Sequence, residues 1–272
     1  MSAAGAWRER AGNAALALAL PVTLLAAWEA LGAAGALRPA FFPRPSALAG
    51  HAAALLADGS LAAHSRATLG RLAWAFALAA IPGVTVGLAM GLSRRAREGL
   101  DPLFALIYPI PSVLFLPLLS FVLRAEGAAL VVTAAITSFF LVVYTTMTGV
   151  QQIDRTVLEA AVHYGARGRR LFLSVLLPGA LPHVFTGLRL GLGYTLIVVV
   201  AVEIAGAQRG LGALLWLSWE ILKVDDMYVA LAAIAVLGGV LMWALGALRA
   251  RAIPWAREAG DAGGRSAGRG AA

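Results

Sequence analysis

Six long apolar stretches follow one another along this chain, and they constrain its fold more than any other feature of the sequence. The first runs from Ala14 to Leu37. As an α-helix it would be about 36 Å long, enough to cross the ~30 Å hydrocarbon core of a bilayer. Backbone groups in lipid must find their hydrogen bonds within the chain, and a helix provides them. We therefore predict an all-α membrane protein of six transmembrane helices, with the other five spans at about 69–92, 103–123, 128–150, 184–205 and 228–248.

The balance of residue types agrees with a membrane protein and excludes several other classes. Of the 272 residues, 60% are hydrophobic and 13% are charged, whereas roughly a quarter of the residues in a soluble domain are charged. Cysteine is absent, so the sequence has no disulfide framework, no thiolate metal site and no thiol nucleophile. No group of His, Asp and Glu has metal-ligand spacing. We predict no metal, no cofactor and no catalytic residues in this chain.

The net charge of +8 could point to nucleic acid, but the arginines cluster in short segments between the apolar spans. This placement suits anionic lipid headgroups, so we expect a lipid bilayer as a partner and no nucleic acid. Lys and Arg are in excess in the cytoplasmic segments of membrane proteins. One side of the six-span order carries most of the 22 basic residues, namely Arg8, Arg10, Arg94, Arg95, Arg97, Arg155, Arg167, Arg169, Arg170, Arg249, Arg251, Arg257, Arg265 and Arg269. We expect that side, with both termini, to be cytoplasmic, although Arg66 and Arg71 break the rule.

Prolines and polar residues inside the spans indicate a candidate solute pathway. Three prolines, including Pro117, should break or kink the third span, and carbonyls freed at membrane depth are tolerated only against protein or a water-filled path. An ionisable residue within a span is a functional candidate by default. The candidate pathway residues are Pro109, Pro111, Ser112, Thr137 and Glu203. The alternatives are a packing kink at the prolines and interfacial solvation of Glu203, which lies close to the outer end of its span.

The longest polar segment between spans runs from Gln151 to Pro182. Apolar residues recur in it at helical spacing, first at Ile153, Val157, Ala160, Ala161 and Tyr164 and then from Leu171 to Leu176. Gly165 lies between the two sets and can end the first helix in a left-handed conformation. Pro178 and Pro182 should stop the second helix. We predict a helix, turn, helix hairpin that faces water.

Within this hairpin Glu159, Ala160, Ala161 and Gly165 spell E-A-A-x-x-x-G, and the chain continues as GARGRRLFLSVLLPGALPHVFTGLRLGLG. The motif and its continuation resemble the EAA loop of ABC-importer permeases, most of all the sulfonate, nitrate and taurine branch, over roughly residues 42–255. The resemblance implies the type I permease fold (MetI-like) and a cytoplasmic loop that inserts into a groove on a separate ATP-binding subunit. The coupling residues would be Glu159, Ala160, Ala161, Gly165, Ala166 and Arg167. The alternative for Glu159 is a surface ion pair with Arg155.

The resemblance also implies a function and a set of partners. We expect the permease subunit of an importer in the bacterial inner membrane, which takes up a small anionic solute of the sulfonate, nitrate or taurine type. The expected partners are two copies of the ATP-binding subunit, a second copy of this chain and a periplasmic or lipid-anchored solute-binding protein. ATP would be bound by the partner, because the sequence has no G-x-x-x-x-G-K-[ST] loop.

Two other functions remain open from the sequence, a secondary transporter driven by an ion gradient and an integral membrane enzyme. Secondary transporters often show repeated halves and ionisable residues at mid-membrane, and neither is clear here. The expected domain plan is a cytoplasmic N-terminus at 1–13, a permease domain at 14–250 and a disordered cytoplasmic tail at 251–272. Within the permease domain we expect the core at about 64–250 and the coupling loop at 151–182.

Overall fold

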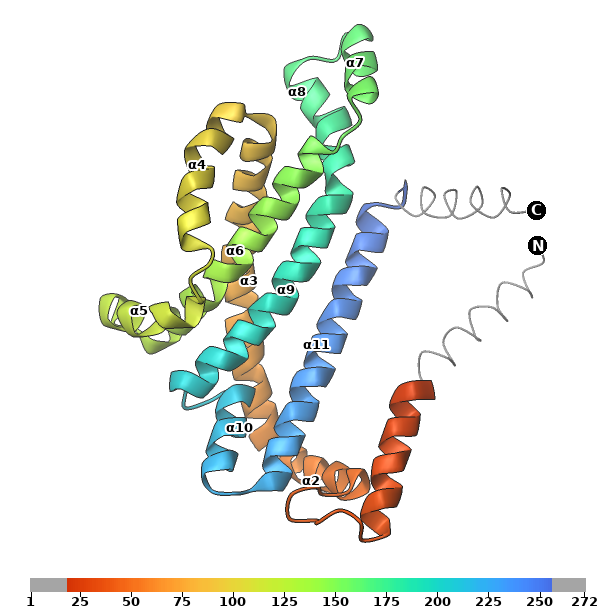
Figure 1. The fold of residues 1–272 in the computed structure, drawn as a ribbon, viewed down its shortest axis with the longest axis vertical. Helices are drawn as coiled ribbons and strands as arrows, with labels where there is room; N and C mark the ends of the chain where they lie inside the picture. The colour runs from red at the N-terminus through yellow and green to blue at the C-terminus, as the bar shows by residue number, and fades with distance from the viewer. Residues whose placement is uncertain (1–18, 256–272) are drawn as a thin grey trace, which may run out of the picture.

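A computed structural model describes residues 19–255 of the chain. All the regular structure in this range is helical (Figure 1). A helix at Ala19–Ala33 comes first. It is followed by α2 (Pro45–Ala57), α3 (Ser60–Leu92), α4 (Arg94–Ile107), η1 (Ser112–Phe115), α5 (Leu116–Leu123), α6 (Glu126–Gln151), α7 (Arg155–His163), α8 (Gly168–Leu171), η2 (Phe172–Leu176), α9 (Leu177–Gly206), α10 (Leu211–Glu220) and α11 (Val224–Ala252).

Four helices are long and apolar enough to cross a membrane, and a bent pair makes a fifth candidate among the described residues. The four are α3, Gly127–Gln151 in α6, the continuous helix Gly168–Gly206 and α11. The all-helical membrane class is thus confirmed. Residues 14–18 of the expected first span lie outside the described residues, as do the whole segment 1–13 and most of the expected tail.

The third span, expected at about 103–123 and broken or kinked by its prolines, is indeed broken, but it begins earlier than expected, at Arg94. Residues 94–123 form two arms, α4 and η1 with α5, bent by 84°. The break between them holds Pro109 and Pro111, which lack the N–H groups that would continue the α4 ladder. The basic cluster expected in a connection opens α4, where the Ser93 side chain caps the helix by accepting a hydrogen bond from the Ala96 N–H.

Pro178 and Pro182 were expected to stop the second helix of the hairpin, and this prediction is wrong. The helix continues from Gly168 to Gly206. Pro178 lies in the first turn of α9, directly after the π-helical turn η2. The shifted hydrogen-bond register of such a turn accommodates a residue without an N–H. Pro182 lies inside α9, and membrane helices tolerate proline because neighbouring helices and hydroxyl groups satisfy the freed backbone groups.

Two other boundaries differ from expectation. The second span begins at Ser60 rather than Leu69, because Gly59 turns the chain with φ +80° and the Asp58 carboxylate accepts a hydrogen bond of 2.8 Å from the Ser60 N–H. The connection expected between the fifth and sixth spans contains the helix α10. Because α3 begins at Ser60, Arg66 and Arg71 both lie on this helix.

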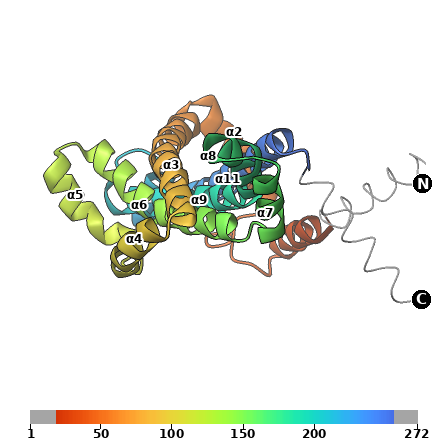
Figure 2. The ribbon, with the colours of Figure 1, turned by 90° about the horizontal axis from the view of Figure 1, so that it is seen from above.

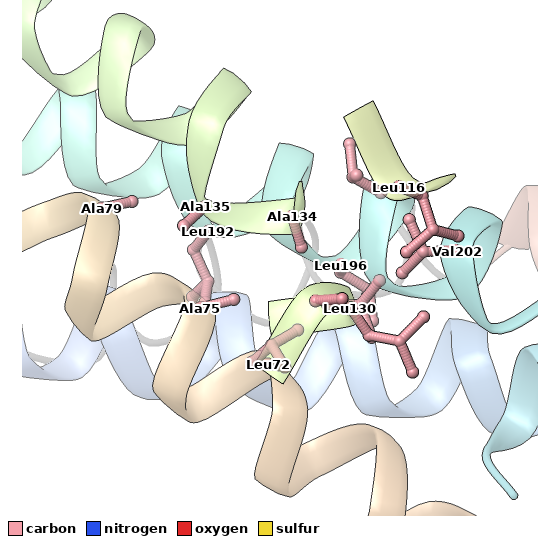
Figure 3. Close-up of a cluster of buried hydrophobic side chains, with 13 residues drawn as sticks. Leu72, Ala75, Ala79, Leu116, Leu130, Ala134, Ala135, Leu192, Leu196 and Val202 are labelled. Atoms are coloured by element: carbon pink, nitrogen blue, oxygen red, sulfur yellow. The ribbon is translucent and has the colours of Figure 1, made fainter. Parts of the chain in front are cut away.

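The core lies where α6 packs along both α3 and α9 (Figures 1 and 2). Its buried side chains are mostly small or aliphatic and come from all three helices (Figure 3). The residues with less than a tenth of their surface exposed include Leu72, Ala75 and Ala79 of α3, Ala134 and Ala135 of α6, and Leu192, Leu196 and Val202 of α9. Lipid tails are as apolar as these side chains, so close packing rather than removal from water holds such helices together.

Small residues let α6 approach both neighbours closely. On α3, Ala79, Gly83 and Gly87 recur every four residues and are buried. A Cβ atom added at Gly87 would lie 2.6 Å from the carbonyl oxygen of Val143 in α6. On α9 a Cβ atom at Gly187 would lie 2.0 Å from the Thr145 hydroxyl oxygen. Glycine at these positions therefore lets the helices approach closely, as small residues in membrane helices do.

Several polar side chains of α6 face protein. Thr133 and Ser138 are fully buried. The Thr133 hydroxyl donates to the Ala129 carbonyl at 2.7 Å, and the hydroxyl oxygens of Ser138 and Thr195 in α9 are 2.7 Å apart. These contacts satisfy hydroxyl groups that would be costly to expose to lipid.

Replacing Gly87 should disturb this packing. We expect Gly87→Ala to destabilise the protein by about 1–3 kcal/mol, because the methyl group meets a backbone carbonyl that cannot move alone. The melting temperature in detergent would measure the loss. Gly70→Ala is the matched control on the same helix, because a Cβ there meets nothing within 4 Å. Equal melting temperatures for the two variants would contradict this account of the α3–α6 contact.

Candidate functional site

The hairpin begins with α7, whose start and end are both defined by local hydrogen bonds. The Asp154 carboxylate caps its first turn by accepting from the Thr156 N–H at 2.8 Å. At the other end the Gly165 N–H donates to the Val162 carbonyl and the Ala166 N–H donates to the Ala161 carbonyl, both at 2.9 Å. This pair of bonds is a Schellman motif, which places the residue after the cap in the left-handed region.

Gly165 has φ +83°, as the sequence predicts for a glycine that ends the first helix. A Cβ atom there would meet nothing within 4 Å. This position therefore favours glycine because of its left-handed backbone conformation, not because space is short. The chain then passes Ala166 and Arg167 and turns again at Gly168, which has φ +50°. The turn reverses the chain and directs α8 into the long helix that contains α9.

The hairpin exposes both charge and apolar surface. Glu159 pairs with Arg155 one turn earlier at 3.2 Å, and its side chain is 64% exposed. Tyr164 is 91% exposed, and Val157 is about half exposed. Ala160 is exposed and Ala161 is partly covered. The apolar face predicted for this helix therefore exists, and its part at Val157, Ala160 and Tyr164 is left exposed by the described chain.

One apolar contact seats the hairpin on the membrane domain. A Cβ atom added at Gly179 near the start of α9 would lie 3.3 Å from Ile153. Ile153 precedes the cap of α7 and thus packs toward α9, unlike the exposed Val157 and Tyr164. Figure 1 shows α7 and α8 together at one end of the molecule, beyond the ends of α6 and α11.

The candidate pathway residues fall into two groups. Pro109 and Pro111 lie in the break between α4 and η1 and are exposed. Ser112, at the start of η1, is 3% exposed, and its hydroxyl oxygen accepts a hydrogen bond of 2.8 Å from Thr137 of α6. The structure thus brings Ser112 and Thr137 together at the bend, and a role for either in a pathway stays a prediction.

Glu203 is fully buried near the end of α9 and belongs to a separate polar network, together with the buried Thr68 and the partly exposed Arg71. Figure 1 shows this end of α9, where α10 follows, far from the hairpin. The Oε1 atom of Glu203 accepts a bond of 2.6 Å from the Arg71 guanidinium and one of 3.0 Å from the Thr68 hydroxyl. Its Oε2 atom accepts from Thr68 at 2.9 Å and from the Gly212 N–H at 3.0 Å. The carboxylate therefore joins α3 to the beginning of α10.

The chain around Gly210 is shaped to receive this carboxylate. Gly210 has φ +138°, and a Cβ atom there would lie 2.3 Å from the Glu203 carboxyl carbon. The Gly212 N–H belongs to the first turn of α10, where the helix dipole favours a negative charge. Thr68 also accepts a bond of 2.8 Å from the Leu211 N–H. A larger residue at 210 would displace the carboxylate from these donors.

Sequence reasoning identified Glu203 but missed its partners. Arg71 stood out only as a basic residue on the wrong side of the membrane, and Thr68 and Gly212 carried no motif. The signal was available, since an arginine and a glutamate near the same end of two spans can pair. Among residues 19–255 no group of three or more His, Asp or Glu side chains is placed to hold a metal ion.

The model of the protein family described as "Binding-protein-dependent transport system inner membrane component" matches residues 83–255. The match includes the hairpin, the bend at 108–111 and Glu203. It therefore covers every candidate site residue except Thr68 and Arg71, which lie just before it.

Several curated proteins are similar over most of the chain. The taurine transport system permease protein TauC of Escherichia coli is 32% identical over 250 residues, covering 89% of this chain and 90% of that protein. The putative aliphatic sulfonates transport permease protein SsuC of Escherichia coli is 31% identical and covers 80% of this chain and 83% of its own. The nitrate import permease protein NrtB of Synechocystis sp. is 28% identical and covers 68% of this chain and 67% of its own.

A solved structure has a similar fold. A chain of the MetNI methionine ABC transporter in inward facing conformations matches with a TM-score of 0.58 at 18% identity. The match covers 69% of this chain and 93% of that chain.

Breaking the Arg71–Glu203 pair should destabilise the protein strongly. We expect Arg71→Leu alone to cost about 3–5 kcal/mol, because it leaves a buried carboxylate without its counter-charge, while adding Glu203→Leu should recover part of that loss. Melting temperatures of the two single variants and the double variant give the coupling. Arg66→Leu, at an exposed position on the same helix, is the control and should change little. If the losses of stability in the two single variants simply added in the double variant, Arg71 and Glu203 would not be coupled as this account requires.

Proposed function

The chain belongs to the family of binding-protein-dependent transport system inner membrane components, and from that membership we propose that two copies of it enclose the pathway by which a small anionic solute enters the cell. The chain is the multi-pass permease subunit of an ABC importer in the inner membrane. ATP hydrolysis belongs to a separate ATPase subunit, and a binding protein delivers the solute. The permease provides the path and a surface on which the ATPase can act.

We propose that the α7–α8 hairpin is the surface that docks on the ATPase subunit, one hairpin for each of two ATPase copies. The observation that carries this proposal is the apolar surface at Val157, Ala160 and Tyr164, the last of them 91% exposed, which the described chain leaves open beside Glu159. Exposed aromatic side chains ringed by polar residues are typical anchors of protein interfaces. Glu159, Ala160, Ala161, Gly165, Ala166 and Arg167 form the docking site, with Gly165 setting the turn.

The continuous helix from Gly168 to Gly206 suits the hairpin to transmit movement. It has 39 residues and is therefore about 58 Å long. Its inner end follows directly from the hairpin, and its outer half is buried in the core through residues such as Leu192 and Val199. When ATP closes the two ATPase subunits, a displacement of the hairpin would act on this helix as a rigid element and shift the pore between inward and outward facing states.

The solute class rests on the printed names of the relatives. Those names specify taurine, aliphatic sulfonates and nitrate, which share a compact anionic oxygen-bearing group. We propose an organic sulfonate or a similar small oxyanion as the solute of this chain. Pro109, Pro111, Ser112, Thr137 and Glu203 are our proposed residues near the path, of which Ser112 and Thr137 are bonded at the bend.

We further propose six membrane spans of the type I permease architecture, with both termini in the cytoplasm. The four long helices and the bent pair supply five spans, and the helix Ala19–Ala33 would form part of the sixth. The arginines at 94, 95, 97, 155, 167, 169, 170, 249 and 251 then all lie on the cytoplasmic side. In this arrangement 1–13 and 251–272 flank a single permease domain at 14–250.

Replacing Glu159 and Gly165 together should uncouple ATP hydrolysis from transport. In the Glu159→Ala, Gly165→Ala double variant, we expect transport in proteoliposomes containing the ATPase and binding protein to fall about tenfold or more. Less ATPase subunit should co-purify, while the amount of permease in the membrane stays the same. The reason is that the first change removes an exposed charge and the second strains the turn at φ +83°.

Glu98→Ala is the matched control for this experiment. Glu98 is also an exposed glutamate, 59% accessible and paired with an arginine four residues earlier, but it lies on α4 outside the hairpin. Its replacement should leave transport and co-purification near the parental level. If the double variant retained its ATPase and transported as well as Glu98→Ala, the hairpin would not be the docking surface.

The six-span arrangement can be tested by labelling, because the chain has no cysteine. Single cysteines introduced beside Gly168 and at Asp58 should react with a membrane-impermeant maleimide from opposite faces of the membrane. Right-side-out and inside-out vesicles distinguish the two faces. Labelling of both positions from the same face would exclude the proposed topology.

A further inference from the structure

A cavity of about 250 Å³ lies between α9 and α11 toward the end of the molecule that carries the hairpin. Its lining combines apolar residues with two arginines, and the residues that matter here are Phe185, Arg189, Leu245, Gly246, Arg249 and Ile253. A Cβ atom added at Gly246 would meet nothing within 4 Å. The side of α11 at Gly246 therefore has free space in front of it.

The two arginines have no carboxylate partner in the part of the chain that the structure describes. Within residues 19–255 the ion pairs are His51–Asp226, Arg71–Glu203, Arg94–Glu98 and Arg155–Glu159. Arg189 and Arg249 thus bring two uncompensated positive charges to one cavity. Guanidinium groups bind phosphate oxygens through paired N–H donors, which makes an anionic phosphate a well-matched ligand.

The depth of the cavity matches the level of lipid headgroups. The helix α11 has Asp225 and Asp226 in its first turn and Arg249 and Arg251 in its last. The distance along the helix from Asp226 to Arg249 is about 34 Å, slightly more than the ~30 Å hydrocarbon core. If the first turn lies at one interface, Arg249 lies at the other. Basic pockets between membrane helices on the cytoplasmic side are suited to acidic headgroups.

The apolar part of the lining favours a ligand with an apolar part. Phe185, which is 8% exposed, and Ile253, which is 1% exposed, are buried apolar residues of the lining, and Leu245 is a third apolar one. A free phosphate ion would use the arginines alone. A phospholipid would use both parts, with its phosphate at the arginines and the first segments of its acyl chains against the apolar lining.

We propose that Arg189 and Arg249 bind the phosphate group of an acidic phospholipid of the inner leaflet, in the cavity between α9 and α11. The lipid bridges the helix that carries the hairpin and the last helix of the described chain. This site is separate from the hairpin and from the residues at the bend. Its existence does not depend on the solute or on ATPase docking.

The test compares lipid retained by purified protein. Membranes containing phosphatidylglycerol are solubilised in a mild detergent, and bound phosphatidylglycerol per chain is measured by native mass spectrometry. We expect the Arg189→Gln, Arg249→Gln variant to retain less lipid, by a factor of about five for each arginine. Arg251→Gln is the matched control, because Arg251 is exposed in the same last turn but does not line the cavity.

A second variant fills the cavity and keeps both charges. Gly246→Phe introduces a ring into the free space in front of α11 and should also lower phosphatidylglycerol retention, with an unchanged elution profile on size exclusion. Retention equal to that of Arg251→Gln in either variant would overturn the proposal. Added inorganic phosphate should not displace the lipid. Displacement by inorganic phosphate at millimolar levels would instead identify a site for a soluble oxyanion and would equally overturn the lipid assignment.

Discussion

The rest of this structure depends on close packing between helices in lipid, where the hydrophobic effect does not drive helices together. In a bilayer the apolar faces of α3, α6 and α9 could contact lipid at no loss, so their association needs surfaces that fit closely. The small residues of α3 and α9 provide such surfaces, and at Gly87 and Gly187 there is no room for a single additional carbon. Hydroxyl pairs such as Ser138–Thr195 add direction to this contact. The core therefore behaves as a rigid body around α6.

Because the core is rigid, it connects two distant features, the Glu203 network and the hairpin, which lie at opposite ends of the helix containing α9. The helix containing α9 is held along its second half by the core and at its last turns by the carboxylate of Glu203, which is bonded to α3 and α10. Its first turns extend beyond the core and carry the hairpin. A buried ion pair contributes little net stability when compared with an apolar pair, but it specifies one arrangement of its neighbours. Here it determines where the turn into α10 lies relative to α3.

The parts that could be predicted from sequence are those that depend on local pattern. Apolar length identified the long helices, and the position of Gly165 between two helical repeats predicted the left-handed turn that the structure shows. Prolines were interpreted with less success. Pro109 and Pro111 break their helix, whereas Pro178 and Pro182 do not, because the outcome depends on the π-helical turn and on neighbouring helices. Two partners of Glu203, Thr68 and Arg71, come from α3, far away in the sequence, and no local pattern indicates them. The cavity between α9 and α11 likewise arises only when the helices are assembled.

The π-helical turn η2 determines the direction in which the hairpin points around the axis of α9. In an α-helix each residue rotates the chain by about 100°, so one additional residue in a turn changes the azimuth of everything beyond it by that amount. The segment Phe172–Leu176 lies between the hairpin and the membrane-embedded part of the same helix. The rotational position of Glu159 and Tyr164 about the α9 axis therefore depends on the one additional residue in this π-helical turn. One residue more or fewer in this segment would turn the hairpin by about 100° around the helix and so, under the proposed docking, away from the ATPase subunit.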